Sequence, residues 1–146
     1  MKNYTIWLRT AAVFQFITAG IHSITLFVSP PPNNETEKQL YNLMGTYQFD
    51  FGAGFHRTMN EMTLALSACL CLLCLFAGLI NFHLVRKRVD ANSMKGVIII
   101  NLVVFGIFFV LTIVFTFLLP IIQAGLILLF LILSIITLRN RSAHDK

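Results

Sequence analysis

The run VIIINLVVFGIFFVLTIVFTFLL, residues 97–119, decides the class of fold to which this chain belongs. It contains 23 residues and no charged side chain. About 20 apolar residues are enough for a helix to cross the ~30 Å hydrocarbon core of a bilayer. Further apolar runs cover residues 6–28, 57–84 and 121–138. We therefore expect an all-α integral membrane protein, a single domain built as a four-helix antiparallel bundle.

The composition supports membership of the membrane class. Of the 146 residues, 57% are hydrophobic and only 12% are charged, whereas about a quarter of a soluble domain is charged. The net charge of +5 does not indicate nucleic acid, because no basic stripe with interleaved aromatic residues is present. The three cysteines lie in apolar runs, so neither a disulfide framework nor thiol redox chemistry is predicted.

The placement of basic residues predicts the orientation. In a four-span arrangement nine of the eleven Lys and Arg residues lie on one side, and only Lys38 and Arg57 lie on the other. Basic residues concentrate on the cytoplasmic side. Both termini are therefore expected in the cytoplasm, in the inner membrane of a bacterium, with residues 29–56 forming an outer loop. The nine residues are Lys2, Arg9, Arg86, Lys87, Arg88, Lys95, Arg139, Arg141 and Lys146.

The outer loop is predicted to carry a helix of its own. Three prolines at 30–32 end the first helix, because proline lacks an N–H and fixes φ. Asn33 and Asn34 are typical helix caps, and leucines recur at helical spacing after them. Residues 35–47 should form a short amphipathic helix at the bundle mouth or in the membrane interface. Within each span, polar and small residues share one stripe, which favours helix association in lipid.

The candidate site lies in FGAGFHRTMNE, residues 51–61, which enters the second span. Ionisable groups at the edge of lipid are costly and suggest a site. His56 and Asn60 are i,i+4 neighbours, as are Arg57 and Glu61. Helical rise places His22, near the end of the first span, at a similar depth. The predicted ligand-binding residues are therefore His22, His56, Arg57, Asn60 and Glu61.

Three interpretations of this cluster stay open. In the first, Arg57 and Glu61 form an ion pair while His22 makes an interhelical hydrogen bond. In the second, Arg57 and the helix N-terminus hold an anion such as a lipid headgroup. In the third, His22 and His56 bind a divalent metal or haem, with Glu61 or Asp50 as a further ligand. No nucleophile elbow, P-loop or dinucleotide fingerprint is present, so no catalytic residue is assigned.

The motif around this cluster resembles a family of small, uncharacterised bacterial four-span membrane proteins. The resemblance rests on Met44, Phe49, Gly54, Arg57-Thr58 and Glu61, and on the segment AGIH at 19–22. It covers about the first half of the chain. Aromatic and glycine residues that follow the acidic position in the family are absent at 62–67. The resemblance implies that these residues act as a unit, and it brings no chemistry with it.

The sequence thus favours a non-enzymatic protein, either an accessory subunit or a binder of lipid or a small ligand, with its polar site on the outer side. No cofactor is expected, and the partners are the bilayer and other membrane subunits or a second copy. The alternative is a membrane-embedded metal- or haem-binding redox protein or enzyme that uses His22, His56 and Glu61. A small transporter is disfavoured, because four spans leave little room for a pathway.

Overall fold

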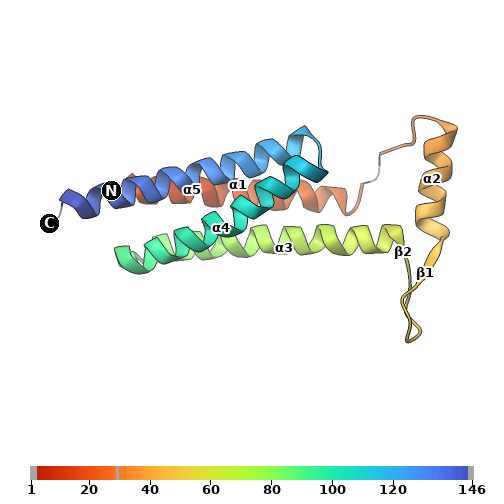
Figure 1. Ribbon diagram of the computed structural model, residues 1–146, viewed down its shortest axis with the longest axis horizontal. Helices are drawn as coiled ribbons and strands as arrows, with labels where there is room; N and C mark the ends of the chain where they lie inside the picture. Colours follow the sequence, from red (N-terminus) through yellow and green to blue (C-terminus); the bar gives the residue numbers. More distant parts are fainter. Residues whose placement is uncertain (1–2, 29, 145–146) are drawn as a thin grey trace. The chain divides into compact units, whose positions relative to one another are not determined.

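The computed structural model describes residues 3–28 and 30–144, and this part of the chain is mostly helical (Figure 1). Lys2 and Lys146, which contribute to the predicted charge bias, lie outside the described residues. Two compact units are present, Met1–Thr18 with Cys74–Lys146, and Ala19–Leu73; we call them the helical unit and the hairpin unit. The elements are α1 (Asn3–Thr25), α2 (Glu35–Thr46), β1 (Gln48–Asp50), β2 (His56–Thr58), α3 (Met59–Arg86), α4 (Ala91–Phe115) and α5 (Leu118–His144).

Three helices are long and apolar enough to cross a membrane. They are α3, α4 and the Leu118–Asn140 part of α5. The prediction of a mostly helical chain is confirmed, and so is the prediction of helices that could span a membrane, for these three. The four-span arrangement and the orientation of the termini stay predictions. The fourth predicted span, α1, is 23 residues long, but Arg9, Gln15 and His22 interrupt its apolar sequence.

The helical unit is held together by small residues and aromatic stacking. Ala11, Ala124 and Cys74 are buried, and small side chains allow helices in lipid to approach closely. Gly78 of α3 illustrates this: a Cβ built on it would lie 2.8 Å from Cε1 of Phe16. On the other side of α1, Trp7 and Phe14 stack on Phe130 of α5, with centroid distances of 6.0 and 5.3 Å.

Two helix boundaries differ from the predicted spans. Residues 91–95, predicted as loop, belong to α4, because Asp90 caps that helix by accepting hydrogen bonds from the N–H groups of Asn92 and Ser93 at 3.0 Å. Pro120, which separates the predicted spans 97–119 and 121–138, lies in the first turn of α5. Proline is tolerated there because N–H groups in the first turn have no intrahelical partner. A turn of two residues joins α4 to α5 (Figure 1).

The hairpin unit contains an element that was not predicted. Asn34 caps α2 by accepting a hydrogen bond from Glu37 N–H at 2.9 Å. Beyond α2 the chain forms an antiparallel hairpin in which Phe49 pairs with Arg57 and Asp50 with His56. Three-residue strands carry too short an alternation of side chains to be recognised by period.

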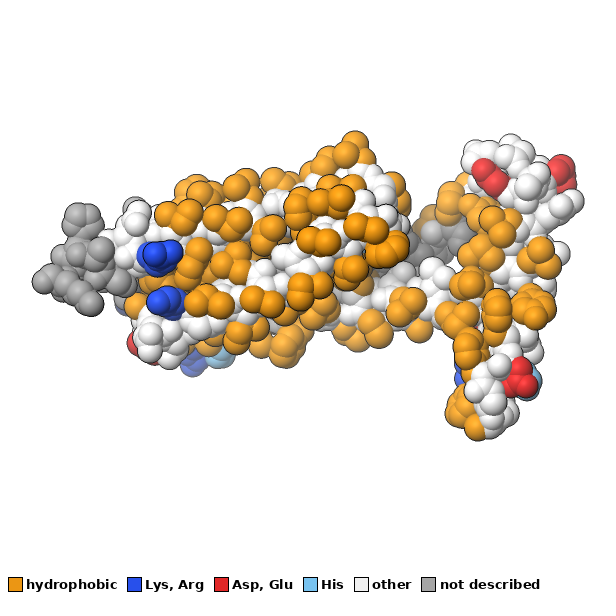
Figure 2. All heavy atoms as spheres, in the orientation of Figure 1, with side chains coloured by type: hydrophobic (Ala, Val, Ile, Leu, Met, Phe, Trp, Pro, Cys, Tyr) orange, Lys and Arg blue, Asp and Glu red, His pale blue; other side chains and the backbone are white. Residues whose placement is uncertain are grey.

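The surface of the long helices is apolar. Exposed leucine, isoleucine, valine and phenylalanine side chains are spread along α3, α4 and α5, and hydrophobic atoms dominate the face in Figure 2. On that face, Lys and Arg atoms of the helical unit gather near its described termini. A water-soluble monomer rarely exposes apolar patches of this kind, whereas a lipid-facing surface is built from them.

Candidate functional site

Four of the five predicted site residues lie where the hairpin enters α3. His56 and Arg57 belong to β2, and Asn60 and Glu61 to the first turn of α3. The hairpin turns within residues 51–55: Gly52 N–H donates to Asp50 Oδ1 at 2.8 Å, and Phe51 N–H to Phe55 O at 3.0 Å. Gly52 and Gly54 have φ of 78° and 81°, a backbone region that glycine enters without steric cost.

Glu61 does not pair with Arg57, which corrects the first interpretation of this cluster. Its carboxylate accepts hydrogen bonds from the N–H and hydroxyl of Thr58, at 2.8 and 3.3 Å. Arg57 instead donates from Nη1 to the carbonyl of His56 at 2.8 Å, and its Cζ lies 6.0 Å from the ring centroid of Phe55. The Glu61 carboxylate therefore serves the start of α3.

The remaining predicted residues, Asn60 and His22, lie in α3 and α1. Asn60 is exposed, and its Nδ2 would lie 3.2 Å from a Cβ built on Gly45. His22 lies in the last turn of α1 and is half-buried. Among residues 3–28 and 30–144, no three His, Cys, Asp or Glu side chains are arranged to hold a metal ion. Ligand binding by His22, His56, Arg57, Asn60 and Glu61 stays a prediction.

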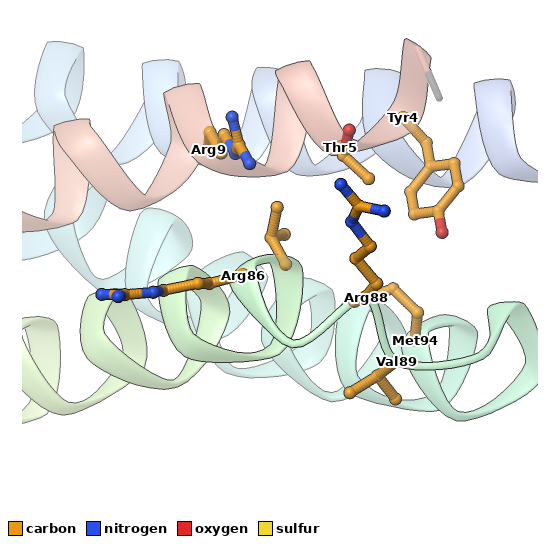
Figure 3. A pocket seen from close by; sticks show the side chains of 8 residues that line it. Tyr4, Thr5, Arg9, Arg86, Arg88, Val89 and Met94 are labelled. Carbon is orange, nitrogen blue, oxygen red and sulfur yellow. The ribbon is translucent and has the colours of Figure 1, made fainter. Parts of the chain in front are cut away.

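A second candidate site is a cavity in the helical unit with a volume of about 590 Å³. Three arginines belong to its lining: Arg9 of α1, Arg86 in the last turn of α3, and Arg88 in the loop that follows. In Figure 3 the Arg86 side chain extends away from Arg88. In Figure 3 the Arg88 side chain extends from the end of α3 toward α1. The described residues that line it are Tyr4, Thr5, Arg9, Val85, Arg86, Arg88, Val89 and Met94. We call this the arginine cavity.

The end of α3 positions two of these arginines. Val89 N–H donates to Leu84 O at 3.3 Å, and Arg88 N–H to Val85 O at 3.2 Å. This 6→1 and 5→2 pair of bonds is a Schellman motif, which ends a helix with one residue in the left-handed conformation. Here that residue is Arg88, with φ 54°. The turn directs the chain from α3 into α4 and leaves Arg86 one residue before the motif's cap.

The arginine cavity has no counter-charge in the described part of the chain. Its lining contains no carboxylate, and none of the three arginines forms an ion pair with an acid in residues 3–28 and 30–144. The nearest acid in sequence, Asp90, is committed to the cap of α4. Hydrogen bonds from the N–H groups of Ser93 and Asn92 hold the pKa of its carboxyl below its usual value. Among the described residues, the lining therefore carries three positive charges and no negative one.

A buried cluster of three amides lies in the same unit. Asn81 donates from Nδ2 to Gln15 Oε1 at 3.0 Å and to Asn101 Oδ1 at 3.1 Å. Gln15 donates to the same Asn101 oxygen at 3.3 Å, and Asn101 donates to the carbonyl of Val97 at 2.9 Å. Gln15 and Asn81 are fully buried. These amides satisfy one another across α1, α3 and α4, and we call them the amide triad.

The sequence did not indicate the arginine cavity, and it did not single out Asn81. Membrane orientation accounts for the arginines as a group, but it does not predict that Arg9, Arg86 and Arg88 line one cavity. Asn81 was not singled out because it lies near the end of the apolar run 57–84, shortly before the basic residues 86–88. A search for single carboxamides within apolar runs would have found it together with Gln15 and Asn101, because unpaired amides are costly in lipid.

Comparisons with known proteins identify no relative: no protein-family model, curated protein or solved structure matches this chain. Its membership of the four-span family suggested by the motif at 44–61 stays a prediction.

Proposed function

We propose that this chain is a four-span membrane protein that binds the anionic headgroup of a membrane lipid in the arginine cavity, on the cytoplasmic side. The observation that supports the proposal is that Arg9, Arg86 and Arg88 line one cavity of about 590 Å³, and that no carboxylate is present among the described residues of its lining. The ligand class is one that the sequence suggested. The proposed site, however, lies away from the predicted outer cluster.

The location of the cavity along the helices supports a lipid ligand. Arg9 is in the first two turns of α1, and Arg86 is in the last turn of α3. If α1 is the fourth span, both positions lie at the same membrane boundary. Nine of the eleven basic residues fall on that side, which assigns it to the cytoplasm by the positive-inside rule. Anionic lipids give the cytoplasmic leaflet its negative surface potential.

The chemistry of the lining suits a phosphate attached to an apolar body. Guanidinium groups form paired hydrogen bonds with phosphate oxygens and are the preferred side chains for binding phosphate in partly buried sites. Val85, Met94 and the ring of Tyr4 provide buried apolar surface in the same cavity. A headgroup phosphate and its glycerol backbone present this combination. We therefore favour a binding or accessory role, in which the bound lipid stabilises the protein or its assembly with other membrane subunits or a second copy.

The experiment is a lipid-binding measurement with charge-matched variants. The protein is purified in detergent and titrated with phosphatidic acid and phosphatidylglycerol, and bound lipid is counted by native mass spectrometry. Arg9→Gln and Arg86→Gln remove charges that line the arginine cavity. Lys87→Gln and Lys95→Gln remove charges of the same sign and on the same side that do not line it.

We expect the arginine variants to lose about tenfold or more in affinity for anionic lipid, since a hydrogen bond to a charged group contributes about 1.5–3 kcal/mol. The lysine variants should retain affinity within about a factor of three, as expected for screened surface charges. An equal loss in all four variants would show nonspecific attraction to a basic surface and would overturn the proposal. Absence of bound anionic lipid in the unmodified protein would overturn it as well.

A further inference from the structure

Arg88 occupies a backbone conformation that stability alone would not select. It is the left-handed residue of the Schellman motif at the end of α3, with φ 54°. Helices that end in this way place glycine there, because a Cβ crowds the backbone in the left-handed region. A residue held in a sparsely populated region costs stability, and such residues cluster at functional sites. The presence of arginine instead of glycine at position 88 therefore needs an explanation other than helix termination.

The strained turn has a visible effect on the side chain. It carries Arg88 out of the helical line of α3, and the guanidinium extends toward α1 near Thr5 (Figure 3). The preceding residue, Lys87, has equal charge and is exposed, but it does not line the arginine cavity. A glycine at position 88 would end the helix equally well and would leave this side of the cavity without a cation.

The charge of the arginine cavity indicates what Arg88 adds. Arg9, Arg86 and Arg88 contribute three positive charges, and none of the described lining residues is a carboxylate that would compensate them. A phosphodiester headgroup such as that of phosphatidylglycerol carries one negative charge on two free oxygens. A terminal phosphate presents three oxygens and a charge of about −1.5 to −2 at neutral pH. The terminal phosphate therefore offsets more of the positive charge of the lining than a phosphodiester does.

We infer that Arg88 is a specificity-determining residue that makes the arginine cavity select ligands with a terminal phosphate over phosphodiesters. This inference rests on the proposed function, because it concerns the same cavity. The terminal phosphate belongs either to a lipid, as in phosphatidic acid, or to free phosphate in the cytoplasm. The apolar part of the lining favours the lipid.

The test combines stability with selectivity. Arg88→Gly and Arg88→Asn remove the guanidinium and relieve the strain, since both residues tolerate the left-handed region. Arg88→Lys keeps the charge and the strain but loses the planar pair of donors. Lys87→Gly is the matched control, because it removes an adjacent charge at a position with no left-handed requirement. Each variant is titrated in detergent with phosphatidic acid, phosphatidylglycerol and inorganic phosphate, and the unfolding temperature of each is measured without ligand.

We expect Arg88→Gly to raise the unfolding temperature of the ligand-free protein by about 2–4 °C, from relief of strain. Its affinity for phosphatidic acid should fall about tenfold or more, while its affinity for phosphatidylglycerol changes less than about threefold. Arg88→Lys should lose part of the selectivity without gaining stability. Lys87→Gly should keep the selectivity and lose stability. Inorganic phosphate should bind at least about tenfold more weakly than phosphatidic acid, for want of apolar contact.

Two results would overturn this inference while leaving the proposed function standing. One is an Arg88→Gly protein that binds both lipids with unchanged selectivity. The other is an Arg88→Gly protein that is no more stable than the unmodified one, which would mean that no strain is held at this turn. If inorganic phosphate binds as tightly as phosphatidic acid, the ligand is the free anion and the lipid assignment fails. If the unmodified protein binds no anionic lipid at all, the proposed function itself is wrong.

Discussion

Thr58 and Glu61 bind each other's backbone at the start of α3. The carboxylate of Glu61 accepts a hydrogen bond from Thr58 N–H at 2.8 Å, and Thr58 Oγ1 accepts one from Glu61 N–H at 3.2 Å. This is a capping box, in which a helix's first residues satisfy N–H groups that have no intrahelical partner. The acidic residue at the mouth of an apolar helix thus has a structural role that needs no ligand.

Glu61→Ala should therefore destabilise the protein by about 1 kcal/mol, the usual loss when a cap is removed. Glu61→Gln should cost less, because an amide oxygen accepts the same hydrogen bond. The measurement is the free energy of unfolding in detergent. Arg57→Gln provides the control: the double variant Arg57→Gln/Glu61→Gln should equal the sum of the two single changes within about 0.5 kcal/mol. A larger coupling would restore the ion pair between these residues.

Removing one member of the amide triad should cost more than removing all three. Asn81→Leu leaves the buried oxygen Oε1 of Gln15 without its hydrogen-bond donor, and we expect a loss of about 1–2 kcal/mol. The triple variant Gln15→Leu/Asn81→Leu/Asn101→Leu removes every polar group together, so its stability should be closer to that of the unmodified protein. Thermal unfolding in detergent compares the variants. If the triple variant is the least stable, the amides contribute net attraction instead.

The contact between Gly78 and Phe16 predicts opposite effects for two glycine substitutions. Gly78→Ala places a methyl group 2.8 Å from the Phe16 ring, and overpacking of this kind costs about 1–3 kcal/mol. Gly106→Ala is the matched control, since nothing lies within 4 Å of its added Cβ. Alanine in a helix interior should stabilise the protein there by about 0.5–1 kcal/mol.

Both effects are read from unfolding temperatures. Gly78→Ala combined with Phe16→Val should recover part of the loss, because the smaller side chain leaves room for the methyl group. If Gly78→Ala stabilises the protein as much as Gly106→Ala does, α1 and α3 do not approach closely at this point.

The sequence predicted what depends on composition along a single helix. Long uncharged runs such as 97–119 have one physical outcome in a membrane, and the structure gives α3, α4 and α5 the required length and hydropathy. The start of α4 was predicted too late in the chain, because its first turn after the Asp90 cap is polar and a polar segment is typical of a loop. Capping depends on one side chain, whereas hydropathy averages over many.

What could not be predicted depends on contacts between segments far apart in the chain. The β hairpin has strands of three residues, too short for a periodic signal. Arg9 and Arg86 are 77 positions apart, and charge counting places them on one side of the membrane but not around one cavity. The Glu61 side chain had two plausible partners, Arg57 at i−4 and Thr58 at i−3, and spacing alone does not choose between them.

The amide triad has a consequence for how the helices find their alignment. Lipid tails solvate leucine about as well as another leucine does, so apolar contact distinguishes poorly between one alignment of two helices and another. Sliding a helix by one turn moves its side chains about 5.4 Å along the axis, far beyond the reach of a hydrogen bond. Such a slip would leave the amides of Gln15, Asn81 and Asn101 without their hydrogen-bond partners. The hydrogen bonds of the amide triad therefore favour one register of α1, α3 and α4, which apolar contacts alone would specify poorly.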